Sequence, residues 1–304
     1  MRSFARLLCL LVLPALAVAA AEPACAGAPV AIPRSAMRTL TASGSGLVYR
    51  VFVAWPDGPA PAAGFPVVYV LDGNAWFASV VETVRVLSGN MQGTGVVPAI
   101  VVSVGYPTDK PHDSARRTRD YTPATGGGET PAGSGGADAF LAFLEQELKP
   151  AIARDWPVDP TRQTLIGHSF GGLFVVHALL TRPEAFQNYV AVSPSIWWNG
   201  CAVLANEAGL ADRLMRAPGV RRVFLAAGEF EQAADPARTR SAERLATLLE
   251  RRMVDNAREL IERLAALPGR PLEAQFAYFP QENHGSVVPG AISRALPFVL
   301  GPAR

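Results

Sequence analysis

Residues 163–180 read QTLIGHSFGGLFVVHALL. The first residues have the apolar, β-branched character of a buried strand, and the run from Gly172 to Leu180 favours an apolar helix. Between them Ser169 lies in the pattern G-x-S-x-G, where small residues are needed because strand and helix converge. A strand, a sharp turn and a helix in this order expose the serine hydroxyl above the carboxyl end of a sheet. The segment therefore predicts a nucleophilic serine.

Strand-like and helix-like segments alternate on both sides of this stretch. The expected strands are 47–54, 66–71, 99–104, 163–166, 189–192, 222–225 and 274–279, and the expected helices are 77–87, 137–153, 172–180, 241–267 and 291–299. Strands separated by helices imply crossover connections and an α/β fold, with a mostly parallel central sheet covered by helices on both faces. We expect a single domain over residues 27–304.

One long segment, about 106–137, interrupts the alternation and contains the Gly-rich stretch TPATGGGETPAGSGGA at 122–137. Such a stretch cannot pack into a core, so it is expected on the surface. Long loops of this kind are more often functional than simple connectors.

Composition excludes several classes of protein. The chain has 304 residues, 49% of them hydrophobic, and 28 Lys and Arg balance 26 Asp and Glu, for a net charge of +2. This balance argues against a nucleic-acid binder and against an acidic disordered tail. Three cysteines without a CxxC pair, and the absence of an HExxH motif, argue against a zinc site. We expect no cofactor and no metal in the bond-breaking step.

The first 26 residues have the layout of a secretory signal peptide. Arg2 and Arg6 precede an apolar stretch from Leu7 to Ala21, and small residues allow cleavage after Ala21 or after Ala26. The apolar stretch is short for a membrane anchor, and the residues before Cys25 are a poor lead-in for a lipoprotein. The Ala-, Arg- and Pro-rich composition is typical of bacterial proteins, so the periplasm is the predicted compartment. No later stretch of sequence is long and apolar enough to span a membrane.

A serine nucleophile needs a general base, and His284 is the best-placed histidine. It follows the last predicted strand, in the sequence QENHG, where a doubly wound hydrolase carries its base. His168 lies inside the turn and is expected to have a packing or hydrogen-bonding role, His177 lies on an apolar helix, and His112 lies in a polar loop without an obvious partner.

The acid that orients the base is expected after the preceding strand, in the chain order serine, acid, histidine. That strand ends at Gly228 and is followed by Glu229, Phe230 and Glu231. The two glutamates share a side if the extended backbone continues. Glu231 is preferred because many hydrolases place the acid three residues after the strand-ending glycine. Glu229, or a Ser-His dyad without a strict acid, remains open.

An oxyanion hole requires two backbone N–H groups directed at the developing negative charge. One is expected from Phe170, directly after the nucleophile. The other is expected from the loop after an earlier strand, VLDGN at 70–74, and we assign it to the N–H of Asn74.

The motifs resemble those of one hydrolase family. GHSFGG at 167–172 and SPSIWW at 193–198 resemble the esterase branch of the α/β-hydrolase superfamily that includes S-formylglutathione hydrolases, antigen 85 mycolyltransferases and siderophore esterases. LDG at 71–73, RTRDYTP at 117–123 and ENHG at 282–285 are most similar to the siderophore esterases, and the resemblance runs from about residue 35 to 300. It implies the α/β-hydrolase fold and a periplasmic enzyme that cleaves a catecholate trilactone such as ferric enterobactin to release iron.

An anionic ferric catecholate would need cationic groups and aromatic faces near the serine. Arg116, Arg117 and Arg119 cluster in the long segment, and Trp197 and Trp198 follow the strand after the nucleophile helix. Arginine binds oxyanions and stacks on aromatic rings, so these residues are the predicted substrate contacts, with Arg117 as the first choice. The alternative is that the arginines form a solvated loop and the tryptophans pack in the core.

Three functions fit these observations. The first is a secreted serine esterase acting on a small-molecule ester. The second is a general carboxylesterase or an acyltransferase, which would pass through the same acyl-enzyme. The third is a non-catalytic binding protein on the same scaffold, whose mark would be loss of the serine or the histidine, and both are present here.

Overall fold

The computed structural model describes residues 30–124, 130–217, 219–269 and 272–302. Residues 30–32 belong to a separate N-terminal unit, Met1–Ile32, and the fold described here is that of the second unit, Pro33–Arg304. The predicted signal peptide, residues 1–26, lies outside the described residues, as does part of the Gly-rich stretch.

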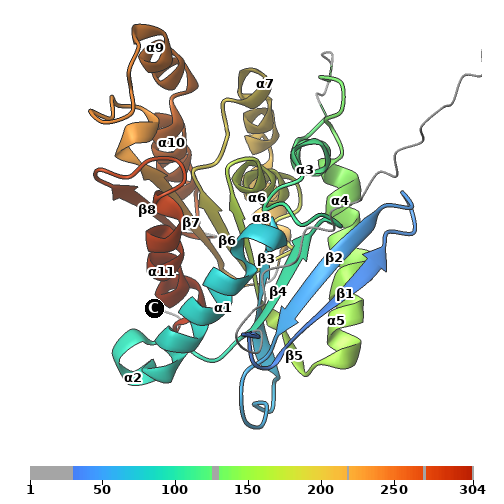
Figure 1. Cartoon of the computed structure of the whole chain (residues 1–304). Coiled ribbons are helices and arrows are strands. Elements are labelled where there is room, and N and C mark those ends of the chain that lie inside the picture. The colour runs from blue at the N-terminus through green and yellow to red at the C-terminus, as the bar shows by residue number, and fades with distance from the viewer. Residues whose placement is uncertain (1–29, 125–129, 218, 270–271, 303–304) are drawn as a thin grey trace, which may run out of the picture. The chain divides into compact units, whose positions relative to one another are not determined.

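The second unit is built on one sheet (Figure 1). Among the described residues the sheet has eight strands: β1 Ser35–Thr41, β2 Val48–Ala54, β3 Phe65–Val70, β4 Ile100–Gly105, β5 Val158–His168, β6 Asn188–Val192, β7 Arg221–Gly228 and β8 Leu272–Phe279. Their order is β1-β2-β4-β3-β5-β6-β7-β8, and the pairs from β4 to β8 are parallel, whereas β1-β2 and β2-β4 are antiparallel. The sheet is therefore mostly parallel, as predicted.

Helices cover both faces of this sheet. The helical elements are α1 Gly73–Gly89, α2 Met91–Thr94, α3 Ser114–Tyr121, α4 Ala137–Phe143, the π-helix η1 Leu144–Leu148, α5 Lys149–Asp155, α6 Phe170–Thr181, α7 Trp198–Cys201, the 3₁₀ helix η2 Ala202–Glu207, α8 Leu210–Arg216, the 3₁₀ helix η3 Glu229–Glu231, α9 Ala242–Arg251, α10 Met253–Ala265 and α11 Val287–Leu300. Helices α1 and α11 pack together on one face, and α6 and α10 pack against β5 to β8 on the other. Because both faces are covered, every residue of β3, β4 and β6 is buried.

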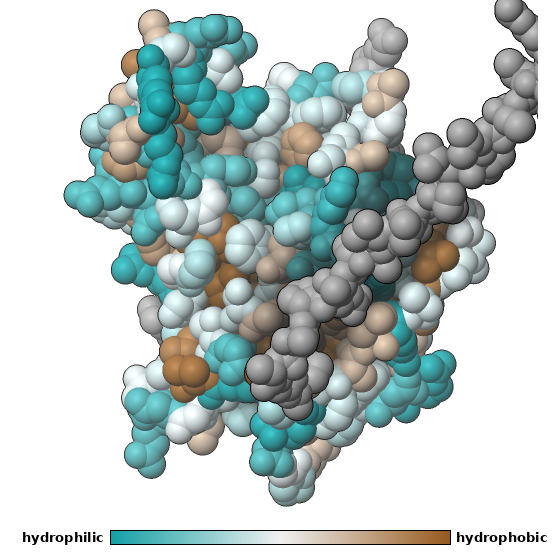
Figure 2. All heavy atoms as spheres, viewed as in Figure 1, coloured by the Kyte–Doolittle hydropathy of each residue, from teal (hydrophilic) through white to brown (hydrophobic). Residues whose placement is uncertain are grey.

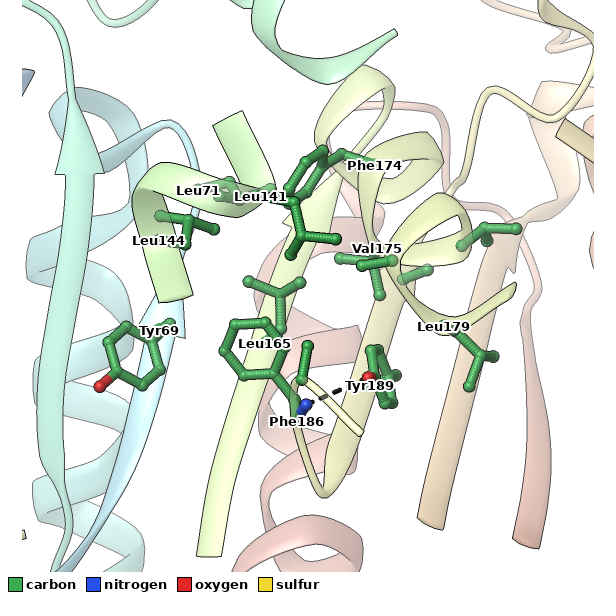
Figure 3. Packing of buried hydrophobic residues seen from close by; sticks show 14 of the residues in the cluster. Tyr69, Leu71, Leu141, Leu144, Leu165, Phe174, Val175, Leu179, Phe186 and Tyr189 are labelled. Carbon is green, nitrogen blue, oxygen red and sulfur yellow. Dashed lines mark hydrogen bonds between the residues drawn. The ribbon is translucent and has the colours of Figure 1, made fainter. Parts of the chain in front are cut away.

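The core between the sheet and the second helix layer is apolar and partly aromatic. Tyr69, Leu165 and Tyr189 project from three neighbouring strands toward helix residues that include Leu141 and Phe174 (Figure 3). The Tyr189 hydroxyl accepts a hydrogen bond from the Phe186 backbone N–H at 3.1 Å, so this buried polar atom is satisfied (Figure 3). This packing fixes β5 and α6, the two elements that hold Ser169.

The predicted elements correspond to observed ones, with differences of one to a few residues at most ends. One strand was not predicted, β1, whose side chains are mostly exposed or half-buried because it is an edge strand with polar residues. The predicted helix 241–267 is divided into α9 and α10 by Arg252, which has a left-handed backbone with φ 47°.

The expectation that about 106–137 would be a long irregular loop was wrong for its middle part. Residues 114–121 form helix α3, whose N-terminus is capped by Asp113 through a 3.0 Å bond from the Arg116 N–H. The sequence gives this helix little apolar periodicity, because its core-facing residues are Asp120 and Tyr121.

The parallel arrangement brings four chain segments to one edge of the sheet. Ser169 follows β5, Ser193 follows β6, Glu231 follows β7, and His284 follows β8. Since the carboxyl ends of parallel strands lie at the same edge, residues that are far apart in sequence meet there. The topology is that of the α/β-hydrolase fold.

Within the described part of the chain, no helix combines the length and the apolar character required to cross a bilayer.

Candidate active site

Ser169 occupies a strained turn between β5 and α6. Its φ is 60° and its ψ is −118°, a combination that residues other than glycine seldom adopt. A Cβ on Gly167 would lie 2.2 Å from the Gly171 carbonyl oxygen, and one on Gly172 would lie 2.9 Å from the Pro194 Cα. Glycine is therefore required at both positions, for the steric reason that the motif predicts.

The turn is also tied to the strand beside it. The Ser169 N–H donates to the Val192 carbonyl oxygen at 3.0 Å, and the Ser169 carbonyl accepts from the Ser195 N–H at 3.1 Å. The Ser169 Oγ lies 3.5 Å from the Ser195 Oγ. Residues after β6 thus hold both the backbone and the surroundings of the nucleophile.

Glu231 is the carboxylate that meets the base. Its Oε1 lies 2.5 Å from His284 Nδ1, and its Oε2 accepts from the Ser193 hydroxyl and from the Gly228 N–H, each at 2.7 Å. Only 2% of Glu231 is exposed. With Nδ1–H donating to a carboxylate, the Nε2 of neutral His284 keeps its lone pair and can accept a proton from a serine hydroxyl.

Glu229, the alternative acid, has another role. Its Oε2 accepts from the Gln281 N–H at 2.7 Å and so holds the loop that leads from β8 to His284. The geometry therefore favours Glu231 over both Glu229 and a dyad without an acid.

His168 supports the loop that carries His284. Its Nε2–H donates to the His284 carbonyl oxygen at 2.7 Å, and the two ring centroids are 4.5 Å apart. Burial, with a smaller effect from neighbouring His284, lowers the pKa of His168 to about 3, so the ring is neutral near pH 7. The residue before the nucleophile thus connects the nucleophile turn with the loop of the base, which is a specific form of the hydrogen-bonding role expected for it.

Ser169 and His284 open into one cavity of about 630 Å³. Its lining combines aromatic, apolar and charged side chains: Arg117, Ser169, Phe170, Ser195, Trp197, Phe230, Glu231, Asp235, Arg238, Thr239, Arg244, Leu248, Arg251, Met253, Asn283, His284 and Ser286. A cavity of this size accommodates a ligand of several rings.

The two predicted oxyanion residues lie in different surroundings. Phe170 is the first residue of α6 and lines the cavity, as a donor next to the nucleophile should. Asn74 is outside the cavity lining, and its side chain binds the backbone of Tyr106 and Thr108 at 2.8 to 3.1 Å. The N–H of Asn74 as the second oxyanion donor stays a prediction.

Arg117 lines the cavity, but its charge is already paired. Its Nε and Nη2 donate to the two oxygens of Asp72 at 3.0 and 2.8 Å, and Nη2 is also 3.4 Å from the His168 carbonyl oxygen. Only 1% of Asp72 is exposed. Burial alone would raise the pKa of Asp72, but the hydrogen bonds from Arg117 and the nearby His112, whose Nδ1 is 3.6 Å from Oδ1, outweigh it and hold the pKa below its usual value.

Helix α3 holds Asp72 through a second residue as well. The Asp72 N–H donates to the Tyr121 hydroxyl at 3.0 Å, and the Arg117 guanidinium lies 5.7 Å from the ring centroid of Phe170. Arg117 therefore braces the loop after β3 against the nucleophile turn. Its expected role as a contact for an anionic substrate stays a prediction.

The other two arginines of the predicted cluster point elsewhere. Arg116 lies over the rings of Tyr49 and Tyr106, at 5.0 and 5.2 Å from their centroids, and Arg119 is 3.9 Å from Asp120. Neither lines the cavity. Consecutive residues of a helix point in different directions, so the three arginines do not form one surface.

The two tryptophans also separate. Trp197 lines the cavity, and the Arg251 guanidinium lies 4.4 Å from its ring centroid. Trp198 is not part of the lining and packs edge to face on Phe170, with centroids 5.0 Å apart. Trp197 is thus placed for substrate contact, and Trp198 supports Phe170 from behind.

Sequence reasoning missed two cationic residues of α9 that line the cavity, Arg244 and Arg251, neither of which has an ion-pair partner in the described part of the chain. Their spacing with Leu248 is that of one helix face, which is the signal that could have identified them. Arg238, in the segment before α9, also lines the cavity and lies 3.4 Å from Asp235. Within the described residues, no cluster of three His, Cys, Asp or Glu side chains is arranged to hold a metal ion.

The carboxylate assignment predicts different effects for two matched variants. Glu231→Gln should lower kcat for p-nitrophenyl acetate by about a thousandfold, because a neutral amide does not stabilise the imidazolium and can hold the ring in the wrong tautomer. Glu229→Gln, which alters only the support of the His284 loop, should lower it by less than about tenfold. Equal small effects would contradict the triad, and the reverse order would transfer the role to Glu229.

The bracing role predicts a uniform effect for Arg117. Arg117→Ala leaves Asp72 buried without its partner, so kcat should fall by about tenfold or more for neutral and anionic esters alike, with KM little changed. Arg119→Ala, which removes the same charge from the same helix outside the cavity, is the control. A loss confined to anionic esters, with KM raised, would show that Arg117 binds substrate directly.

Comparison with known proteins agrees with this geometry. A family model described as "Putative esterase" matches residues 46–265. The chain is 41% identical to the ferri-bacillibactin esterase BesA of Bacillus subtilis, over 89% of this chain and 91% of that protein. It is 35% identical to a siderophore enterobactin esterase of Emericella nidulans, over 83% and 89% of the two chains.

Solved structures are also similar to this chain over most of its length. The BES protein of Bacillus cereus has a TM-score of 0.79 and 36% identity, covering 91% of this chain and 99% of that one. The siderophore hydrolase EstB of Aspergillus nidulans also has a TM-score of 0.79, with 30% identity and 90% and 98% coverage. With Ser169, His284 and Glu231 assembled at one cavity, the chain belongs to this esterase family and is a serine hydrolase that acts on carboxylic esters.

Proposed function

We propose that this protein is a siderophore esterase that hydrolyses the trilactone of a ferric catecholate such as ferric enterobactin and thereby promotes release of the iron. The observation that carries the proposal is the Ser169, His284 and Glu231 site opening into a wide cavity with aromatic and cationic walls. The relatives named for ferri-bacillibactin and enterobactin, which align over most of the chain, support the choice of substrate class.

The chemistry that we propose is that of a serine, histidine and carboxylate triad. His284 Nε2 takes the Ser169 hydroxyl proton as Oγ attacks the ester carbonyl, and Glu231 stabilises the imidazolium that forms. The tetrahedral intermediate collapses when the C–O bond to the leaving alcohol breaks and His284 returns the proton to that alcohol. Water, activated by the same histidine, then cleaves the acyl-enzyme and releases the acid.

Iron is part of the substrate in this reaction and takes no part in bond breaking. In a trilactone, one ring joins three catechol arms, so each arm sees the metal at a high effective concentration once the first arm is bound. Opening the ring and cutting it into shorter pieces removes this advantage. Ester hydrolysis alone therefore weakens iron binding, without any change in the catechols themselves.

The test is hydrolysis of ferric enterobactin by purified protein, followed by chromatography of the linear products. Wild type should cleave it, and Ser169→Ala should lose at least about a thousandfold in turnover while keeping its melting temperature. Hydrolysis of p-nitrophenyl acetate shows that the preparation is active. A wild-type enzyme that cleaves p-nitrophenyl acetate and leaves the trilactone intact would contradict the substrate, and an active Ser169→Ala would contradict the mechanism.

We further propose that the enzyme is secreted to the periplasm by residues 1–26. The support is the pattern of two arginines, an apolar stretch and small residues at 2–26. In a Gram-negative host, osmotic shock should release the esterase activity of the full chain, whereas a chain lacking residues 2–26 should stay with the cytoplasmic fraction. Ser169→Ala with the leader intact gives the background activity. Retention of the full chain in the cytoplasm would contradict the proposal.

A further inference from the structure

Helix α9 forms one wall of the cavity and contributes little to the core. Of its ten residues only Leu248 is buried, while Leu249 is 52% exposed. In Figure 1 the helix projects from the sheet at the upper left, and Figure 2 shows mostly hydrophilic residues in that region. The fold therefore places few demands on the sequence of α9.

The residues that α9 directs into the cavity share one face. Arg244, Leu248 and Arg251 all line it, and their spacing of four and three residues puts them one above another on a helix. The face presents a cation, an apolar side chain and a second cation in turn. Ser241 fixes the start of the helix, since its Oγ accepts from the Arg244 N–H at 3.1 Å.

The charges of the cavity are unevenly compensated. Arg117 is paired with Asp72, Arg238 lies near Asp235, and Glu231 holds His284. Arg244 and Arg251, by contrast, have no carboxylate within ion-pair distance among the residues that the structure describes. The uncompensated charge of the cavity is thus positive, and it lies on α9.

Trp197, which follows β6, completes this wall of the cavity through its contact with Arg251. Its ring lies 4.4 Å from the Arg251 guanidinium, and it also borders Phe170, with centroids 6.4 Å apart. Stacking on an indole restrains a guanidinium while leaving its N–H donors free, because the ring accepts no proton and carries no charge. Trp197 therefore connects the cationic face of α9 with the residue beside the nucleophile.

We propose that Arg244, Leu248 and Arg251 of α9, together with Trp197, are the subsite that recognises the anionic aromatic part of the substrate. The assignment rests on the proposed function for the identity of the ligand and adds the residues that select it. Guanidinium groups donate to catecholate oxygens and stack on catechol rings, and the leucine between them packs against the apolar ring edge. A neutral acyl ester would use the same nucleophile without this wall.

The first experiment compares charge-removing variants on two substrates. For Arg244→Gln and Arg251→Gln, the ratio of kcat/KM for ferric enterobactin to that for p-nitrophenyl acetate should fall about tenfold each, mainly through KM. The double variant should show the larger fall, and its preference for the ferric substrate should depend less on salt than that of wild type. Arg240→Gln removes an exposed arginine just before α9 that does not line the cavity, and it should leave the ratio unchanged.

The second experiment does not depend on cleavage of the trilactone. The iron(III) complex of 2,3-dihydroxybenzoate has anionic catechol arms and no ester, so it should inhibit p-nitrophenyl acetate hydrolysis competitively. Its inhibition constant should rise about tenfold in Arg244→Gln and in Arg251→Gln and stay unchanged in Arg240→Gln. It should also rise about tenfold in Trp197→Ala, and less in Trp197→Phe, which keeps an aromatic face.

The two experiments separate the two proposals. An unchanged inhibition constant in the arginine variants, or an equal change in Arg240→Gln, would overturn the subsite. Sensitivity of the inhibition constant to α9, combined with an intact trilactone, would keep the subsite for anionic aromatic ligands and overturn the proposed substrate. A selective rise in KM confined to the α9 and Trp197 variants would support both.

Discussion

The backbone of Ser169, held at a positive φ between β5 and α6, is the constraint on which the rest of the site depends. A lone residue would leave this conformation, since it costs about 1–3 kcal/mol. It persists because glycines at 167 and 172 allow the closest approaches, and because the Ser169 backbone is bonded to Val192 and Ser195. The buried core beneath the sheet fixes those partners. Packing of the core thus holds the Ser169 backbone in the conformation that exposes its hydroxyl.

The base and its acid reach that hydroxyl from parts of the chain far away in sequence, and parallel strands make this possible. The His168 ring bonds the His284 carbonyl, Glu231 bonds the His284 ring, and Ser193 bonds Glu231. The loops after β5, β6, β7 and β8 are therefore connected to one another by side chains as well as through the sheet. A shift in one of these loops is transmitted to the geometry of the others.

The sequence was informative where chemistry depends on order along the chain and on steric exclusion. The glycines around Ser169 and the succession of serine, acid and histidine identify the fold and the candidates, and only the choice between Glu229 and Glu231 required the structure, since both follow the same strand. The pairing of Arg117 with Asp72 could not be foreseen, because α3 has a polar surface and no apolar period. The α9 wall was missed although its residues share one helix face, because the sequence does not show that this face borders the cavity.

The break at Arg252 separates two neighbouring helices that differ in how much they bury. Helix α10 packs on β7 and β8 and buries seven of its residues, so substitutions there are paid for in folding stability. Helix α9 begins at its own cap, ends at the break and buries a single leucine. Its sequence can therefore drift, and its charges can be exchanged, while the sheet and the nucleophile remain intact. Substitutions in α9 therefore change the wall of the cavity more than they change the stability of the sheet.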